Sequence, residues 1–302
     1  MPRKSTSLEA IRRQIDQIDD DVHRLLVKRA QLVGRVAAAK ARDGGGPALR
    51  PEREAQVLRR LLKRNQGNLP PVVVARIWRE LFPAMVRLQG PLEVIVCGVP
   101  DTTSHWDLAR SHFGSATPMT VAGTSQRALA SLKRINRTGG GAIAVLPLPS
   151  GRGEGRWWSK LMSGAVNAPR VIGKLPFVSE SGNSTADTEA MVVGSVEWRP
   201  SGDDQTLIAL ETRPRNSARK VLAWLKAANL SGRAIATCLR EGTSGRRLHL
   251  IQISEYVDTQ DIRFKELRDL AEGAVTKAIV IGGYPTCYQV EVSSKSSKRS
   301  RR

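Results

Sequence analysis

The first 90 residues carry apolar side chains at the spacing of an α-helix. They recur in alternating steps of three and four, at Leu8, Ile11, Ile15, Ile18, Val22, Leu25, Leu32 and Val36. We expect one helix that starts at the capping-box sequence Thr6–Glu9 and stops at Gly44–Pro47. It would be roughly 50 Å long. A region of this size cannot bury such a helix along its length, so the pattern predicts a helical dimer.

Two further helices are expected in the same region. One begins at Pro51, a favourable first residue, and ends near Gly67. The other follows Pro71 and runs to Leu88, and Pro83 should bend it. Residues 1–90 are therefore predicted to form an all-helical domain.

The pattern changes after residue 90. Apolar runs at residues 92–97 and 142–147 are typical of buried strands, and helical stretches at 105–113 and 125–134 lie between them. This alternation predicts an α/β domain with a parallel sheet over residues 91–200.

A third unit is expected at residues 203–290. Its strands and helices alternate in the ferredoxin-like order βαββαβ, at 205–212, 217–228, 233–239, 248–254, 262–271 and 278–281. The predicted fold class is therefore multidomain, α plus α/β, and residues 291–302 are expected to be a basic disordered tail.

Composition indicates the class of protein. No run of 18 apolar residues exists, which argues against a membrane span, and residues 1–7 lack the apolar core of a secretory signal. The three cysteines and four histidines have no metal-ligand spacing. We therefore expect a cytoplasmic protein that needs no cofactor or metal.

The positive charge is concentrated at the two ends. The net charge is +20; residues 1–90 hold 19 Lys and Arg against 9 Asp and Glu, and residues 293–302 add five more cations with no acid. Such a balance favours an anionic partner, whether nucleic acid, a membrane surface or a small polyanion, although solubility alone would also explain it. Aromatic residues are only 4% of the chain, so a nucleic-acid-binding surface is the weaker reading.

Three cations of the first helix are candidates for binding an anion. The apolar residues that recur along the first helix form an apolar stripe. Arg29 occupies a position of this stripe where the spacing predicts an apolar residue, and a charge buried there needs a partner of opposite charge. Lys40 returns to nearly the same face 11 residues later. Arg12 lies too far along the helix to join them, but in an antiparallel dimer it would reach the site of the partner chain. The alternative is that these are surface cations with buried stems.

Glu54 and Gln89 also point toward the predicted core. Glu54 shares a helix face with Leu58 and Leu61, although an acid in a first turn also favours the helix dipole. Gln89 follows Met85 by four residues, at a helix end where a solvated Gln would be ordinary. With no nucleophile and base beside them, these residues suit electrostatic binding of a dianion.

These residues stand in segments that resemble the all-helical class of chorismate mutase. The segments follow the family order and are Leu8–Asp19, Leu26–Arg29, Ala38–Lys40, Arg50–Glu54 and Ile77–Gln89. The resemblance implies an isomerase that converts chorismate to prephenate by a Claisen rearrangement, in phenylalanine and tyrosine synthesis, as a homodimer joined through these helices.

The resemblance also implies roles for single residues. Arg29, with Arg12 of the partner subunit, would hold the two carboxylates of chorismate. Lys40 and Gln89 would donate to its ether oxygen, and Glu54 would accept from its ring hydroxyl. Arg53 and Met85 would line the substrate site; Met85 stands where the family often has a small hydroxyl residue.

The rest of the chain resembles the dehydratase part of bifunctional chorismate mutase/prephenate dehydratases. Gly98–His105 is similar to a glycine-rich turn of that part, but Val145–Ser150 lacks its Glu-Asn pair and Thr188–Met191 lacks its Arg and Phe. Only a short loop stands where a second lobe is needed, so we expect a truncated domain without dehydratase activity. The alternative is a bifunctional enzyme regulated by phenylalanine.

Residues 203–290 resemble the ACT domain that follows the dehydratase. Ala278–Pro285 is close to the closing strand of that domain, whereas Asn216–Arg219 and Ala236–Leu239 are poor matches to its phenylalanine-binding segments. The resemblance leaves two readings open: an amino-acid-regulated domain and a dimerising scaffold.

Overall fold

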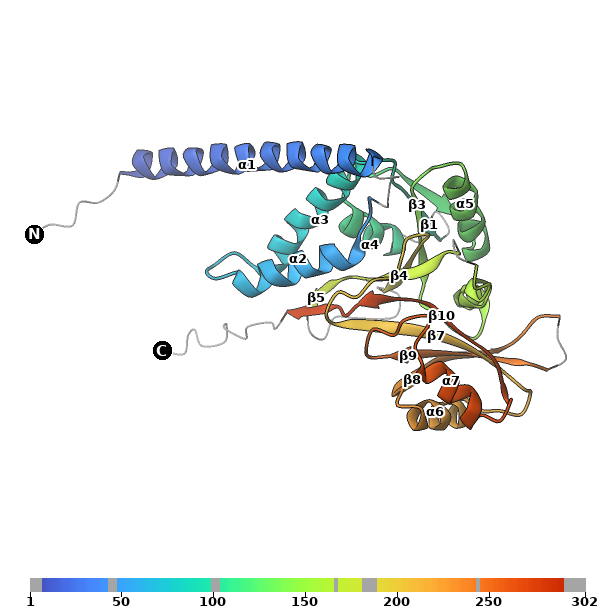
Figure 1. Cartoon of the computed structure of the whole chain (residues 1–302). Helices are drawn as coiled ribbons and strands as arrows, with labels where there is room; N and C mark the ends of the chain where they lie inside the picture. Colours follow the sequence, from blue (N-terminus) through green and yellow to red (C-terminus); the bar gives the residue numbers. More distant parts are fainter. Residues whose placement is uncertain are drawn as a thin grey trace, which may run out of the picture.

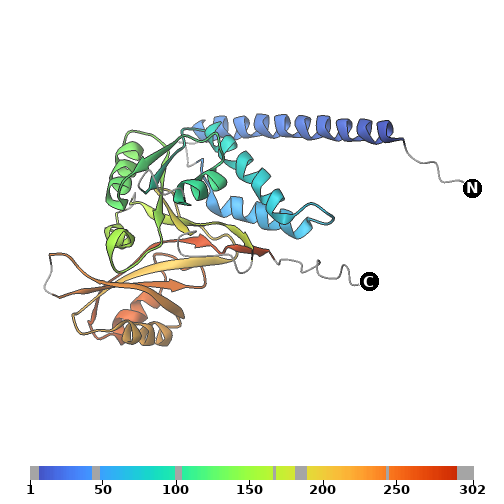
Figure 2. The same ribbon diagram turned by 180° about the vertical axis from the view of Figure 1, so that it is seen from behind.

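The computed structural model describes residues 7–42, 48–98, 104–165, 168–180, 189–242 and 245–290. Three helices, α1 (Leu8–Arg42), α2 (Pro51–Arg64) and α3 (Pro71–Arg87), precede a large sheet with helices on its faces. Figure 1 shows α1 extending from the body as a single rod, with α2 and α3 between it and the sheet. The view from behind shows α6 and α7 at the far side of the sheet from these helices (Figure 2).

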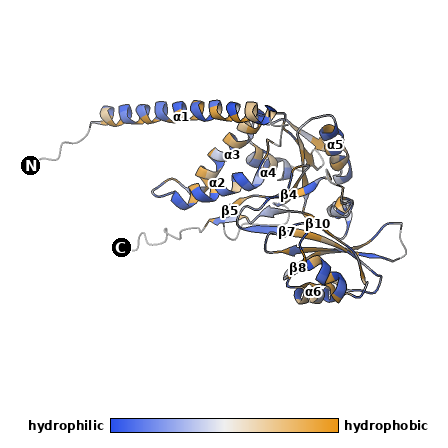
Figure 3. Cartoon of the chain, in the orientation of Figure 1, coloured by the Kyte–Doolittle hydropathy of each residue, from blue (hydrophilic) through white to orange (hydrophobic). Residues whose placement is uncertain are grey.

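α1 is the long helix that the sequence predicts, and it has 35 residues. The Ser7 hydroxyl accepts a hydrogen bond from the Ala10 N–H at 3.2 Å, which caps the helix start. None of its residues is buried. Figure 3 shows apolar positions repeating along its whole length. Thr6 and the expected stop at Gly44–Pro47 lie outside the described residues.

α2 and α3 pack on each other and on the body. Both begin with proline at the first turn, which suits positions whose N–H groups have no partner in the helix. Their shared core consists of Ala55, Leu58, Ala75 and Phe82, and Phe177 from the body closes it. Arg59 of α2 donates hydrogen bonds to the backbone oxygens of Ser201, Asp203 and Thr286. The helical region is thus tied to two parts of the chain that follow it.

The sheet has nine strands in the order β2-β1-β3-β6-β4-β10-β7-β9-β8. Its first half contains β1 (Glu93–Cys97), β2 (Met119–Ala122), β3 (Ala142–Pro147), β4 (Arg170–Leu175) and β6 (Ala190–Gly194). β1 is parallel to β2 and β3, as expected. β6 is antiparallel to both β3 and β4, so the parallel sheet predicted for residues 91–200 is wrong at this point.

Residues 176–189 connect β4 to β6 and include the short strand β5. Their described part contains no helix of the kind that usually joins parallel neighbours. α4 (Ser104–Phe113) and α5 (Ser125–Arg137) provide the crossovers of the parallel part. A 3₁₀-helix, η1 (Gly153–Leu161), follows β3, and its Trp157 and Trp158 are buried.

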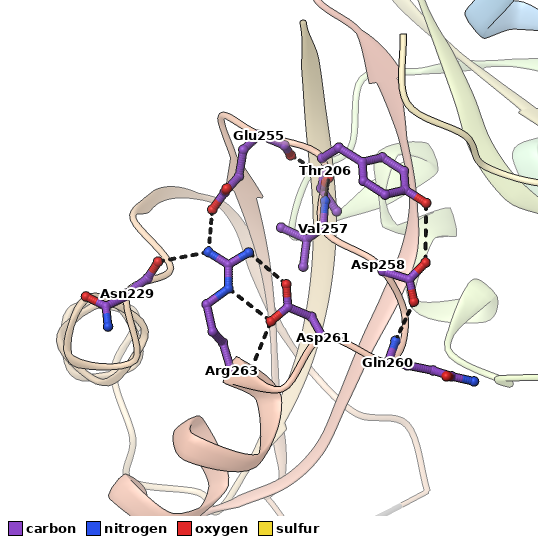
Figure 4. A network of polar contacts seen from close by, with 9 residues as sticks. Thr206, Asn229, Glu255, Val257, Asp258, Gln260, Asp261 and Arg263 are labelled. Carbon is purple, nitrogen blue, oxygen red and sulfur yellow. Dashed lines mark hydrogen bonds and ion pairs between the residues drawn. The ribbon is translucent and has the colours of Figure 1, made fainter. Parts of the chain in front are cut away.

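The second half of the sheet follows the βαββαβ order predicted for residues 203–290. The elements are β7 (Asp204–Thr212), α6 (Ala218–Ala227), β8 (Gly232–Leu239), β9 (Arg247–Ile253), α7 (Arg263–Leu270) and β10 (Val275–Pro285). Arg263, the first residue of α7, donates hydrogen bonds to Asp261, Glu255 and the backbone oxygen of Asn229 (Figure 4). β10 also pairs with β4, so one sheet runs through both halves.

A small second sheet pairs β5 (Val178–Glu180) with β11 (Tyr288–Val290) in parallel. None of the helices in the described part of the chain has the length and apolarity that a membrane crossing requires. Residues 291–302, where the sequence predicts a basic tail, lie outside the described residues.

Candidate active site

A cavity of about 600 Å³ lies between the C-terminal half of α1 and the facing sides of α2 and α3. It brings together six of the seven residues that the sequence singles out: Arg29, Lys40, Arg53, Glu54, Met85 and Gln89. Arg12 lies on the exposed, distant part of α1 and does not line this cavity. Three helices that are separate in sequence thus converge on one site.

Arg29 is a partly buried cation in this cavity. Its Nη1 atom is enclosed and has no hydrogen-bond partner among the residues that the structure describes. The guanidinium lies over the ring of Phe82, 5.8 Å from its centroid. Burial lowers the pKa of Arg29, and the charge of Glu54 opposes that effect. An enclosed guanidinium donor of this kind fits an anionic ligand.

Lys40 and Gln89 meet at the same end of the cavity. The Lys40 Nζ atom lies 3.5 Å from Gln89 Oε1, and Gln89 Nε2 donates to the Met85 backbone oxygen at 3.1 Å. Burial lowers the pKa of Lys40, the positive charge of Arg50 lowers it further, and Glu52 opposes both. Gln89 therefore faces inward as expected, and Lys40 lines the same cavity as Arg29, whose helix face it was expected to share.

Glu54 forms an ion pair with Arg79 at 2.9 Å, with 14% and 8% of the two side chains exposed. Burial raises the pKa of Glu54, and the adjacent Arg79 opposes that rise through its charge and hydrogen bond. The prediction that Glu54 points inward is correct, but its partner was not anticipated. Arg79 follows Ala75 by four residues on the buried face of α3, and this spacing was the available signal.

The cavity has a strong excess of positive charge. Its cations are Arg29, Lys40, Arg50, Arg53 and Arg60, and Glu54 is the one acid among the lining residues. Apolar side chains complete the wall, including Trp78 and Phe82. Arg50, Arg60 and these two aromatic rings were not predicted as site residues from the sequence. Five cations around one cavity favour a small dianion, and the apolar wall favours a ring.

The chemistry available in this cavity is electrostatic. Its lining contains no histidine, cysteine or serine. Among the residues that the structure describes, no three or more His, Cys, Asp and Glu side chains gather as a metal site would require. Charge that develops on a bound ligand would therefore be met by fixed cations and by the amide of Gln89.

The dehydratase-like segments are built differently from this cavity. Trp157 and Trp158 donate their indole N–H groups to the backbone oxygens of Pro147 and Ser150, so buried rings pack against the Val145–Ser150 segment. Glu189 pairs with Lys174 at 2.8 Å. Thr188 and most of the Gly98–His105 turn lie outside the described residues.

The helical region is similar to known proteins. Residues 11–90 match the model described as chorismate mutase type II, which confirms the resemblance expected for these helices. A bifunctional chorismate mutase/prephenate dehydratase of Pseudomonas aeruginosa is 38% identical over 119 residues, which cover 37% of this chain and 32% of that protein. A protein of the same name from Neisseria gonorrhoeae is 40% identical over 105 residues, 35% of this chain and 28% of the relative.

The chain therefore spans about a third of the length of the curated relatives that it matches. Among solved structures, the prephenate dehydratase of Streptococcus mutans is similar with a TM-score of 0.43 and 14% sequence identity, over 66% of this chain and 99% of that one.

Proposed function

We propose that this protein is a chorismate mutase, which converts chorismate to prephenate by an intramolecular Claisen rearrangement. The observation that carries the proposal is the convergence of Arg29, Lys40 and Gln89 on one cationic cavity, within the residues that match chorismate mutase type II. Chorismate is a ring with two carboxylates, and a cavity with five cations and an apolar wall suits it. Its use in phenylalanine and tyrosine synthesis, and its cytoplasmic location, belong to the same proposal.

Arg29 is the first carboxylate-binding group, because its enclosed Nη1 has no partner among the described residues. Arg53 stands at the cavity wall beside Glu54 and supports the same anion. Met85 supplies an apolar contact for the ring. Holding both carboxylates favours the compact conformer in which the reacting carbons are close, and this removes part of the entropic barrier.

Lys40 is the main catalytic group. In the rearrangement, cleavage of the ether bond runs ahead of carbon–carbon bond formation, so negative charge grows on the ether oxygen. A Lys40 ammonium beside that oxygen stabilises the transition state more than the ground state. Gln89 contributes a second donor when its Nε2 leaves the Met85 backbone oxygen. Glu54, held by Arg79, accepts from the ring hydroxyl.

A homodimer through the N-terminal helices completes this proposal. The large apolar residues of α1 are exposed, and a single chain leaves the whole stripe in water. Covering it with a second copy would stabilise the pair by about 1.5–3 kcal/mol for each side chain that becomes fully buried. In an antiparallel pair, Arg12 of the partner subunit would reach the cavity and supply a further cation.

The remainder of the chain takes a supporting role in this proposal. Residues 91–200 are a truncated dehydratase-like domain without that activity, because only residues 176–189 stand between β4 and β6 and leave no room for a second lobe. Residues 203–290 are an ACT-like domain. The βαββαβ order and the strand order β10-β7-β9-β8 support that assignment.

The test is chorismate consumption by the purified chain, with the product identified before and after mild acid. Prephenate as the product supports the proposal, and phenylpyruvate formed before acid treatment would show that the middle domain is catalytic. Lys40→Ala should abolish turnover while circular dichroism shows the helices intact. Lys28→Ala, which removes an exposed lysine of the same helix, is the matched control. Near-normal turnover in Lys40→Ala would refute the role of Lys40.

A further inference from the structure

A second cavity, of about 270 Å³, lies on a neighbouring face of α3, between α3, α4 and the turn that precedes β5. We call it the α3–α4 cavity. Most of its wall is apolar, formed by Val72, Val73, Ala75, Leu108, Pro176, Phe177 and Val178. Val72, Ala75 and Arg79 lie about a quarter turn round α3 from the residues that line the first cavity. A volume of this size holds a single aromatic ring with a short side chain.

The polar part of this cavity is cationic. Arg76 and Arg79 line it, and no acid does. Arg79 uses Nη1 for its bond to Glu54, and its other guanidinium nitrogens have no hydrogen-bond partner in the part of the chain that the structure describes. Its Cζ atom lies over the ring of Phe177, 5.1 Å from the ring centroid. Arg76 is exposed at the rim and makes no ion pair with a described residue.

His112 completes the polar wall. Burial and the nearby charge of Arg79 hold its pKa well below 6.5, so the ring is neutral at neutral pH. Its ring nitrogens have no hydrogen-bond partner among the described residues. A neutral imidazole beside two guanidinium groups can donate to or accept from a ligand without adding charge.

The two cavities are linked through one ion pair. A void of about 30 Å³ lies between them and is lined by Glu54, Arg79, His112 and Phe177. Glu54 also lines the first cavity, whereas Arg79 also lines the α3–α4 cavity. A ligand that binds Arg79 from one side therefore acts on the residue that holds Glu54 on the other.

We propose that the α3–α4 cavity binds a small molecule with one carboxylate and an aromatic or similarly apolar body, and that this ligand draws Arg79 away from Glu54. The carboxylate pairs with Arg79 and Arg76, and the apolar body lies against Leu108 and Phe177. An ammonium group would meet two cations and no acid there, so the cavity selects simple carboxylates over amino acids. The effect on catalysis rests on the proposed mutase function, because Glu54 then loses the cation that positions it.

Binding is tested first, with calorimetry on the full chain and 3-phenylpropanoate as the probe. We expect it to bind at least tenfold more tightly than 3-phenylpropanol, which lacks the charge, and L-phenylalanine, which adds an ammonium group. Arg76→Gln should weaken binding about tenfold, a difference of about 1.4 kcal/mol. Arg110→Gln, an exposed arginine of α4 outside the lining, is the matched control and should leave binding unchanged.

Two more variants separate the cavities. Ser111→Phe, at an exposed position of the α3–α4 lining, should block the probe, whereas Arg29→Gln, in the first cavity, should not. The opposite pattern, or equal binding of the alcohol or of phenylalanine, would overturn the site.

The effect on catalysis is tested separately. In mutase assays the probe should lower kcat without raising KM, and Ser111→Phe should abolish that inhibition. Probe binding with an unchanged mutase rate would overturn the coupling alone, and binding stays measurable even if the chain lacks mutase activity.

Discussion

Glu54 and Arg79 join two helices through an ion pair of 2.9 Å that is almost completely withdrawn from water. Glu54 comes from the first turn of α2 and Arg79 from the middle of α3. Burial pushes both groups toward their neutral forms, and each holds the other in its charged form. The carboxylate that faces the candidate active site thus depends on a cation that belongs to the second cavity.

Arg79→Met should destabilise the fold by about 3–5 kcal/mol, because it leaves a buried carboxylate without its partner. The Glu54→Gln/Arg79→Met double variant should be more stable than Arg79→Met alone. Chemical denaturation followed by circular dichroism measures both. Equal stability of the single and double variants would show that the unpaired Glu54 carboxylate does not destabilise Arg79→Met.

The cost of Arg79→Met should also depend on pH. Burial raises the pKa of folded Glu54 above 4.5, and removal of Arg79 raises it further. The folded state then keeps its proton at a pH where the unfolded state has lost it, so stability falls as pH rises through that window. The variant should therefore approach the wild type near pH 5 and depart from it near pH 8. A difference that stays constant across this range would contradict the assignment.

His112→Asn should make the free energy of unfolding less dependent on pH on the acid side of neutrality. Burial, followed by the charge of Arg79, holds the pKa of folded His112 well below 6.5. As pH falls below 6.5, the unfolded state takes up a proton that the folded state does not, so wild-type stability falls. The slope from this one group is at most about 1.4 kcal/mol per pH unit. Denaturation curves near pH 7.5 and near pH 5.5 should show a smaller loss in the variant.

Periodicity predicted much of the fold. The stripe from Leu8 to Val36 indicated α1 because each step falls on one helical face, and the βαββαβ order of residues 203–290 appears as expected. β4 and β6 were missed. Their burial comes from neighbours on both sides in the sheet, and the antiparallel insertion of β6 depends on a connection that leaves no local pattern.

The site was predictable wherever a polar residue broke an apolar pattern. Arg29 and Glu54 stood out for that reason, and the spacing of 11 residues placed Lys40 on the face of Arg29. Arg79 escaped because an arginine on a helix is usually exposed, and its burial depends on Phe177, nearly a hundred residues later. Arg50 and Arg60 were not predicted because they contribute to the summed electrostatic field of the cavity, and only the folded arrangement brings these charges together.

Leu25→Glu should separate the proposed dimer. Leu25 is 60% exposed in the single chain, and a carboxylate at the centre of a helix–helix interface would be buried without a partner. Light scattering at micromolar concentration should report a monomer with little mutase activity. Gln31 lies about 200° round α1 from Arg29 and so off the apolar stripe. The control variant Gln31→Glu should therefore remain dimeric. A dimeric, active Leu25→Glu variant would place the interface elsewhere.

Arg50→Gln should move the alkaline limit of mutase activity to higher pH. Burial and the positive charge of Arg50 lower the pKa of Lys40, so the ammonium group is lost earlier on the alkaline side than in an ordinary lysine. Removing the charge of Arg50 raises that pKa. Glu52, which pairs with Arg50 at 3.0 Å, also raises the pKa of Lys40, and in the variant Arg50 no longer opposes it. The pH profile of kcat for chorismate should shift to higher pH in this variant.

Lys63→Gln is the control. It removes an equal charge from α2 outside the cavity and should leave the profile unchanged. A downward shift, or an equal shift in both variants, would mean that Lys40 does not set the alkaline limit.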